Sequence, residues 1–265
     1  MWTSRQVLES FCHKASSFVT LTYNQENLPK DGCVKPEDVK DWLKRLRYHL
    51  DENNRPKIRF YLVGEYGDDS LRPHYHASVF GLDPLDGEFV ERAWINTDSG
   101  KSLGFVDVKE FNRETAQYVA GYVVKGWARE EHRDRPDGLA PEFGRMSNRP
   151  GIGADAMSVL ADSFLPFMEC LEDVPHVVRF NGKLWPIGRY LRDKLRKVVD
   201  MSDEEIAEIK QKFITAKTEE VCALLRNAIE VGEALSASGV LSEKSKGAIA
   251  ELEAREKITR SRRTL

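Results

Sequence analysis

Long apolar runs, paired cysteines and an excess of basic charge are all missing from this 265-residue sequence. No run approaches the roughly 20 apolar residues that cross a bilayer, and the first residues lack the basic start and apolar centre of a signal peptide. The four cysteines are scattered and form no CxxC pair, which argues against a disulfide framework or a structural zinc site. These features predict a globular cytoplasmic protein with no membrane partner.

The charge balance argues against a protein that coats nucleic acid. The net charge is −3 and the pI is near 6.1, whereas non-specific binding depends on many Lys and Arg side chains that neutralise phosphates. Any contact with a nucleic acid is therefore expected to be local. Basic residues gather between positions 40 and 59, and Lys44, Arg45 and Arg47 are the expected contacts, with Tyr48 beside them.

The hydrophobic pattern predicts an α+β fold. Strands are expected at residues 18–23, 58–66, 74–81 and 104–111, and helices at 36–50 and 114–130. Trp42 lies on the apolar stripe of the first helix and is assigned to the core. The order of these elements predicts a mainly antiparallel central sheet with flanking helices, as in ferredoxin-like or RRM-like folds.

This sheet domain is expected to cover residues 1–160. Residues 161–265 are expected to form a mostly helical extension of unassigned role, with helices at 202–213, 218–235 and 242–258. Ser202 and Glu205 have the spacing of a capping box, which predicts the start of the first of these helices.

Two histidines stand one residue apart on a predicted strand. Side chains alternate along a strand, so His74 and His76 point to the same face, and Glu65 comes opposite them in the predicted hairpin. Two imidazoles and one carboxylate leave coordination positions open, which suits a catalytic ion, and action on a phosphate favours Mg²⁺ or Mn²⁺. Taken alone, an HxH pair can equally be a feature of a solvated sheet face.

Two tyrosines, Tyr118 and Tyr122, are four residues apart. This spacing places them on one face of a helix or of a strand, and Lys125 joins that face only on a helix, which we favour. A phenol that attacked a DNA phosphate would form a phosphotyrosine link and release a 3′ hydroxyl. The link conserves the bond energy, in agreement with the lack of a GxxxxGK[ST] segment. Alone, such a pair can also be two aromatic anchors in an apolar helix.

In their order along the chain, the segments FVTLTY, GEYG, RPHYH and YVAGYVVK resemble the motifs of the HUH endonuclease superfamily. The two-tyrosine rolling-circle replication initiators of microvirus-type single-stranded-DNA bacteriophages look most similar, and residues 146–155 (MSNRPGIGAD) extend the likeness. The resemblance implies a palm-like antiparallel sheet. It also implies roles for eight residues: metal ligands His74, His76 and Glu65, nucleophiles Tyr118 and Tyr122, the accompanying Lys125, and Thr20 and Thr22 in a supporting motif.

The resemblance further implies metal-dependent, site-specific nicking and rejoining of one DNA strand through a covalent 5′-phosphotyrosine intermediate. The expected partners are single-stranded or unwound origin DNA, contacted by Arg72 as well as by the basic helix, and the helicase and polymerase of a bacterial host, in whose cytoplasm the protein would act. Two alternatives stay open. One is a non-catalytic nucleic-acid-binding module of similar fold, and the other is a metal-dependent phosphodiesterase that uses water as its nucleophile.

Overall fold

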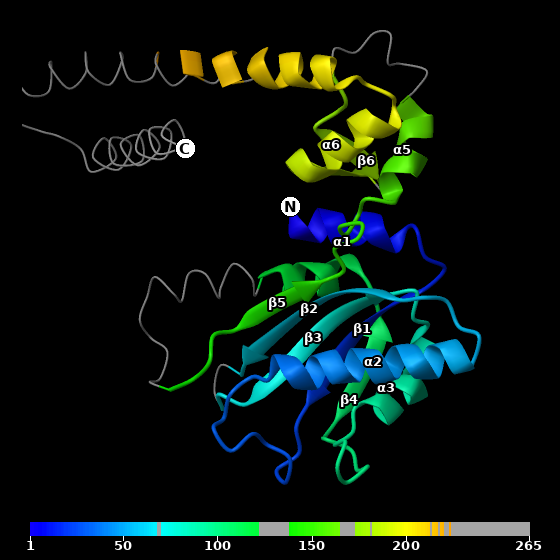
Figure 1. Ribbon diagram of the computed structural model, residues 1–265, viewed down its shortest axis with the longest axis vertical. Helices are drawn as coiled ribbons and strands as arrows, with labels where there is room; N and C mark the ends of the chain where they lie inside the picture. The colour runs from blue at the N-terminus through cyan, green and yellow to red at the C-terminus, as the bar shows by residue number, and fades with distance from the viewer. Residues whose placement is uncertain are drawn as a thin grey trace, which may run out of the picture. The chain divides into compact units, whose positions relative to one another are not determined.

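The computed structural model contains two compact units, Met1–Met201 and Ser202–Leu265 (Figure 1). It describes residues 1–67, 70–121, 138–164, 173–180, 182–212, 214–216, 218–219 and 223. Among these residues, no helix combines the length and the apolar character that crossing a membrane requires.

Five antiparallel strands form the central sheet of the first unit, in the order β4-β1-β3-β2-β5. Their bounds are Ser16–Thr22 (β1), Arg59–Tyr66 (β2), Pro73–Phe80 (β3), Val106–Glu110 (β4) and Phe143–Met146 (β5). The α+β class and the antiparallel sheet are as predicted. The edge strand β5 was not predicted, because four residues are too short a run to carry a clear alternation.

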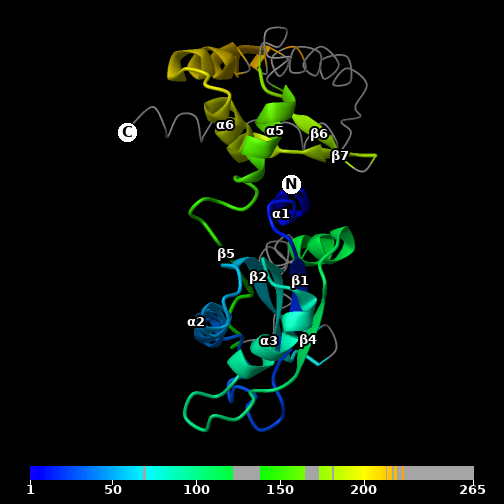
Figure 2. The same ribbon diagram turned by 90° about the vertical axis from the view of Figure 1, so that its right-hand side faces the viewer.

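One face of the sheet is covered by α2 (Pro36–Glu52) and by α3 (Gly87–Ala93), which follows a short 3-10 turn, η1 (Pro84–Asp86) (Figures 1 and 2). Proline opens α2 and acidic residues follow in its first turn, as helix geometry and the helix dipole favour. Its apolar stripe packs on the sheet, and Trp42 is fully buried, so its assignment to the core is confirmed.

The opposite face of the sheet is covered in part by α1 (Trp2–Ser10) and by the helical residues 113–121 (Figure 2). Gln6 joins all three layers, since its side chain donates to the Ala116 carbonyl at 3.3 Å and accepts from the Ser78 hydroxyl at 2.7 Å. Phe18, Val119 and Ile152 belong to the apolar cluster between these helices and the sheet. The helix predicted at 114–130 is present up to residue 121, and the rest lies outside the described residues.

The first unit continues past residue 160, where the sheet domain was expected to end. It also contains α5 (Ala156–Phe164), the hairpin of β6 (Val177–Phe180) and β7 (Lys183–Pro186), and α6 (Gly188–Val198). These elements share a buried apolar cluster with α1, and its members include Val7, Leu8, Met157, Trp185 and Leu191.

The second unit begins with the predicted capping box. The Ser202 backbone N–H donates to Glu205 Oε2 at 2.7 Å, and the Glu205 backbone N–H donates to Ser202 Oγ at 3.1 Å. Residues 203–212 are helical, so the start of this helix is confirmed. The helices expected at 218–235 and 242–258 lie outside the described residues except for 218–219 and 223, which are helical.

Candidate active site

The β2–β3 hairpin aligns the candidate metal ligands. Glu65 lies directly opposite His74, as the sequence predicted, and Val63 lies opposite His76. On the other side of β3, β1 places Thr20 opposite His76 and Thr22 opposite His74. All of these residues except Val63 have polar side chains, and they lie on the face of the sheet away from α2, since Tyr75 and Ala77 between and beyond the histidines belong to the core beneath that helix.

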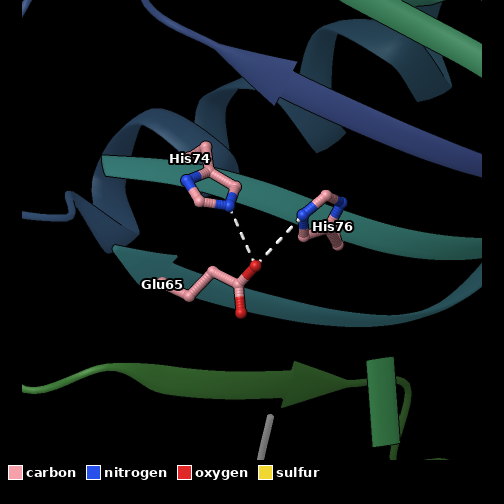
Figure 3. Close-up of side chains that lie close together, drawn as sticks. All are labelled: Glu65, His74 and His76. Atoms are coloured by element: carbon pink, nitrogen blue, oxygen red, sulfur yellow. Dashed lines mark hydrogen bonds and ion pairs between the residues drawn. The ribbon is translucent and has the colours of Figure 1, made fainter. Parts of the chain in front are cut away.

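The three candidate ligands point at one another (Figure 3). Glu65 Oε1 lies 2.9 Å from His74 Nε2 and 3.1 Å from His76 Nε2, and one ligand atom from each residue falls within 4.8 Å of the others. Glu65 is only 1% exposed, and its second oxygen, Oε2, is buried with no hydrogen-bond partner among the residues that the structure describes. A buried carboxylate oxygen without a donor is costly, so this atom suits a cation.

The far sides of both imidazole rings are held by hydrogen-bond acceptors. His74 Nδ1 lies 3.0 Å from the Arg72 carbonyl oxygen, and His76 Nδ1 lies 3.0 Å from Thr20 Oγ1. A carbonyl can only accept, so His74 carries its proton on Nδ1, and the Thr20 hydroxyl can accept from His76 in the same way. Neutral rings in this form turn two Nε2 lone pairs toward a carboxylate. That donor set repels itself unless a proton or a metal ion lies between its members.

The electrostatics of His74 reflect this surplus of negative charge. Burial by itself lowers the pKa of His74, but the hydrogen bonds to Glu65 and to the Arg72 carbonyl, together with the charges of Glu65 and Glu142, leave the pKa raised above its usual value. Glu142 was missed by the sequence analysis because it comes just before the unpredicted strand β5. Its Oε1 accepts from the Tyr66 backbone N–H at 3.3 Å.

Tyr118 lies beside the histidines. Its ring centroid is 5.0 Å from that of His76, with the two planes almost perpendicular at 89°, and 6.2 Å from that of Phe18. The side chain is 45% exposed, so a substrate can reach it from solvent. The structure therefore brings together one predicted nucleophile and the predicted metal ligands. The other two members of the tyrosine motif, Tyr122 and Lys125, lie outside the described residues.

The basic helix lies away from this group. α2 covers the opposite face of the sheet, where Lys44 and Arg47 are exposed. Arg45 uses its guanidinium on the segment after α3, with donations to Ala93 O at 2.8 Å, to Ile95 O at 3.1 Å and to Thr97 Oγ1 at 3.2 Å. Its contacts in the structure are therefore intramolecular, and DNA binding by these three residues stays a prediction.

Arg72 is close to the candidate ligands, but its guanidinium also has partners within the protein. It donates to Gln25 Oε1 at 2.9 Å and to the Tyr23 carbonyl at 3.0 Å. Its own carbonyl accepts from His74, as described above. The arrangement indicates that Arg72 orients His74 through the backbone, a role that the sequence analysis did not foresee.

Comparison with known proteins agrees with this site. Residues 16–127 match the model of a family of replication-associated proteins, the ORF2 family. Replication-associated protein ORF4 of Chlamydia phage 1 is 29% identical over 209 residues, which are 74% of this chain and 50% of that protein. Replication-associated protein ORF2 of Spiroplasma virus 4 is 30% identical over 166 residues, 57% of this chain and 50% of that protein.

A third relative, replication-associated protein VP4 of Bdellovibrio phage phiMH2K, is 28% identical over 200 residues, 68% of this chain and 58% of that protein. The chain thus spans about half the length of the curated relatives it matches. No solved structure matches it. The segment matched by the family model contains β1 to β4, Glu65, both histidines and Tyr118, and by this match the chain belongs to the ORF2 family of replication-associated proteins, with relatives in microvirus-type phages.

Proposed function

We propose that this chain initiates rolling-circle replication of phage DNA by nicking and rejoining one strand at the origin. The observation that carries the proposal is the position of Tyr118, whose ring lies 5.0 Å from that of the candidate ligand His76. A nucleophile beside a three-ligand site is the arrangement that metal-assisted transesterification of a phosphodiester needs. The names of the relatives, all replication-associated proteins, support the same role.

Glu65, His74 and His76 would hold one divalent cation, Mg²⁺ or Mn²⁺. The orphaned Glu65 Oε2 and the two Nε2 atoms that face Glu65 fit such an ion. Three protein ligands leave positions for phosphate oxygens, and a bound cation would supply Lewis-acid polarisation of the scissile phosphate. Thr20 and the Arg72 carbonyl would keep both imidazoles oriented toward the ion.

Tyr118 is the proposed nucleophile. Its phenolic oxygen forms a bond to phosphorus while the bond from phosphorus to the 3′ oxygen breaks. The phenol loses its proton and the 3′ oxygen gains one, so the products are a 5′-phosphotyrosine and a free 3′ hydroxyl. The reverse reaction rejoins the strand without ATP. Tyr122 would be the second nucleophile and Lys125 would stabilise phenolate or phosphate, both on the strength of the sequence motif.

The substrate would be single-stranded or unwound at the nick, because Glu65 and the two histidines lie in the surface of a sheet that a stacked duplex phosphate cannot readily approach. Glu65 is 1% exposed, and the side chains of His74 and His76 are 18% and 8% exposed. Unwinding and synthesis would then fall to the helicase and polymerase of the host cell, in whose cytoplasm the reaction would occur.

The deciding experiment incubates the protein with Mn²⁺ and single-stranded DNA that contains the origin of a microvirus-type phage. A denaturing gel should show a covalent protein–DNA band, and mass spectrometry should locate the adduct on a tyrosine of the motif. The double variant Tyr118→Phe, Tyr122→Phe should form no band, whereas Tyr48→Phe, with its exposed ring on the opposite face of the sheet, should behave as wild type.

The two alternatives predict other outcomes. A metal-dependent phosphodiesterase would cleave the strand without any adduct, and a binding module would retain the DNA without cleaving it. Replacement of His74 and His76 by Ala should abolish cleavage while circular dichroism shows an intact fold. Full activity of that variant would refute the metal assignment.

A further inference from the structure

An exposed phenylalanine shares one row of the sheet with the candidate metal ligands. The Thr22 backbone N–H donates to the Phe105 carbonyl at 3.0 Å, which places Phe105 opposite Thr22 at the start of β4. Thr22 lies opposite His74, and His74 lies opposite Glu65. The row across four adjacent strands therefore runs Phe105, Thr22, His74, Glu65.

The ring of Phe105 lies on the ligand face of the sheet. Val106 and Val108 pack against the core beneath α2, and side chains alternate along a strand, so Phe105, Asp107 and Lys109 lie on the other face. Phe105 is 73% exposed, more than any other phenylalanine, tyrosine or tryptophan of the described residues. Exposure of so large an apolar side chain beside a candidate site points to a ligand that covers it.

The backbone that carries Phe105 is held firmly against β1. The Asn24 backbone N–H donates to the Leu103 carbonyl at 2.9 Å, and the Trp94 indole donates to the Thr22 carbonyl at 2.9 Å. A Cβ atom at Gly104 would collide with the Thr22 carbonyl oxygen, so glycine is required for this close approach. The exposed ring is therefore presented from a fixed position.

We propose that Phe105 is a stacking platform for one base of the single-stranded DNA whose scissile phosphate lies at the metal site, an inference that rests on the proposed function. Two strand spacings separate Phe105 from His74, or about 10 Å between Cα atoms. That distance corresponds to about three nucleotides at helical spacing and fewer in an extended strand. The base is thus close to the nick.

The local charge favours stacking over phosphate contacts. Lys109, the basic side chain nearest to Phe105 along β4, pairs with Asp107 at 2.6 Å, so this patch carries little net charge. A protein with a net charge of −3 has few phosphate contacts to draw on. Aromatic stacking offers affinity without that charge, and it accepts any base because every base has a π-face.

The test compares Phe105→Ala, Phe105→Trp and Tyr48→Ala in binding to the origin single strand and in binding to Mn²⁺ alone. We expect Phe105→Ala to weaken DNA binding about 5- to 150-fold, which is the range for loss of one stacked base, with unchanged Mn²⁺ affinity. Phe105→Trp should retain DNA binding, and its added fluorescence should fall when DNA binds. An abasic site at the stacked nucleotide should weaken binding to wild type but not to Phe105→Ala.

Several outcomes decide the matter. Equal DNA affinity of wild type and Phe105→Ala would overturn the stacking site, as would a loss of affinity in Tyr48→Ala, because Tyr48 is exposed on the α2 face. Weaker binding by Phe105→Ala in a protein that forms no covalent adduct would support the stacking site and refute the nicking reaction. The two proposals therefore fail separately.

Discussion

Thr20 offers a sharp test of the candidate metal site, because it contacts a proposed ligand without being one. Its hydroxyl lies 3.0 Å from His76 Nδ1. Thr20→Val keeps the β-branched shape of the side chain in β1 and removes this acceptor. If the hydroxyl orients His76, the variant should fold normally and bind metal more weakly.

The magnitude follows from the burial of His76, whose side chain is 8% exposed. Loss of a hydrogen bond to a buried polar group costs about 1–3 kcal/mol. That loss favours the ring form with its proton on Nε2, which faces Glu65 Oε1 at 3.1 Å and cannot bind a metal through that nitrogen. Binding must then overcome the same free energy, so Mn²⁺ affinity should fall about 10- to 100-fold.

Two measurements on the whole chain check this. Titration with Mn²⁺, followed by the electron paramagnetic resonance signal of the free ion, gives the affinity without any DNA. Nitrogen-15 NMR of the histidine rings in the metal-free protein reports which nitrogen of His76 carries the proton, and we expect a shift toward Nε2 in Thr20→Val.

The matched variants are Thr20→Ser, which keeps the hydroxyl, and Thr22→Val. The Thr22 hydroxyl contacts the Phe105 carbonyl at 3.4 Å and neither histidine ring. Thr20→Ser should bind Mn²⁺ nearly as wild type does, and Thr22→Val should leave the affinity unchanged. Equal Mn²⁺ affinity in Thr20→Val and wild type, with metal bound by both, would refute the reasoning.

Two further predictions concern groups away from the metal ligands. Asp173 is held by Arg192 and Arg196, and these arginines keep its pKa below the usual value although burial itself acts to raise it. This stabilisation is present above the ordinary Asp pKa of about 3.9 and is lost as the pH falls through the lower folded-state value. Asp173→Asn should therefore lower the free energy of unfolding by about 3 kcal/mol at neutral pH and flatten its decline in acid, as urea titrations at several pH values would show; an unchanged acid limb would contradict this. Arg45→Met should cost about 1–3 kcal/mol of stability through its lost bonds to residues 93–97, and the salt dependence of DNA binding should stay the same. A slope reduced by about one would instead identify Arg45 as a phosphate contact.

Local patterns accounted for much of the sheet and for the candidate ligands. Strong alternation predicted β1 to β4, the apolar stripe predicted α2, and the capping box predicted the helix after Ser202. The short elements, β5, β6, β7 and α3, were missed because four to seven residues carry too little periodicity, and tertiary packing stabilises them instead. The site followed the same division. Glu65 was foreseen from the hairpin, whereas Glu142 was hidden by the missed strand β5.

The sequence by itself determined that Glu65, His74 and His76 would converge, since a hairpin and the two-residue period of a strand leave no other arrangement. Only the tertiary structure decided what surrounds them. It placed Tyr118 beside His76 by packing a helix on the sheet, moved the basic helix α2 to the opposite face, and brought Phe105 into the row of the ligands. Such neighbours depend on how faces with similar apolar patterns pair across long stretches of chain, and no local pattern in the sequence contains that choice.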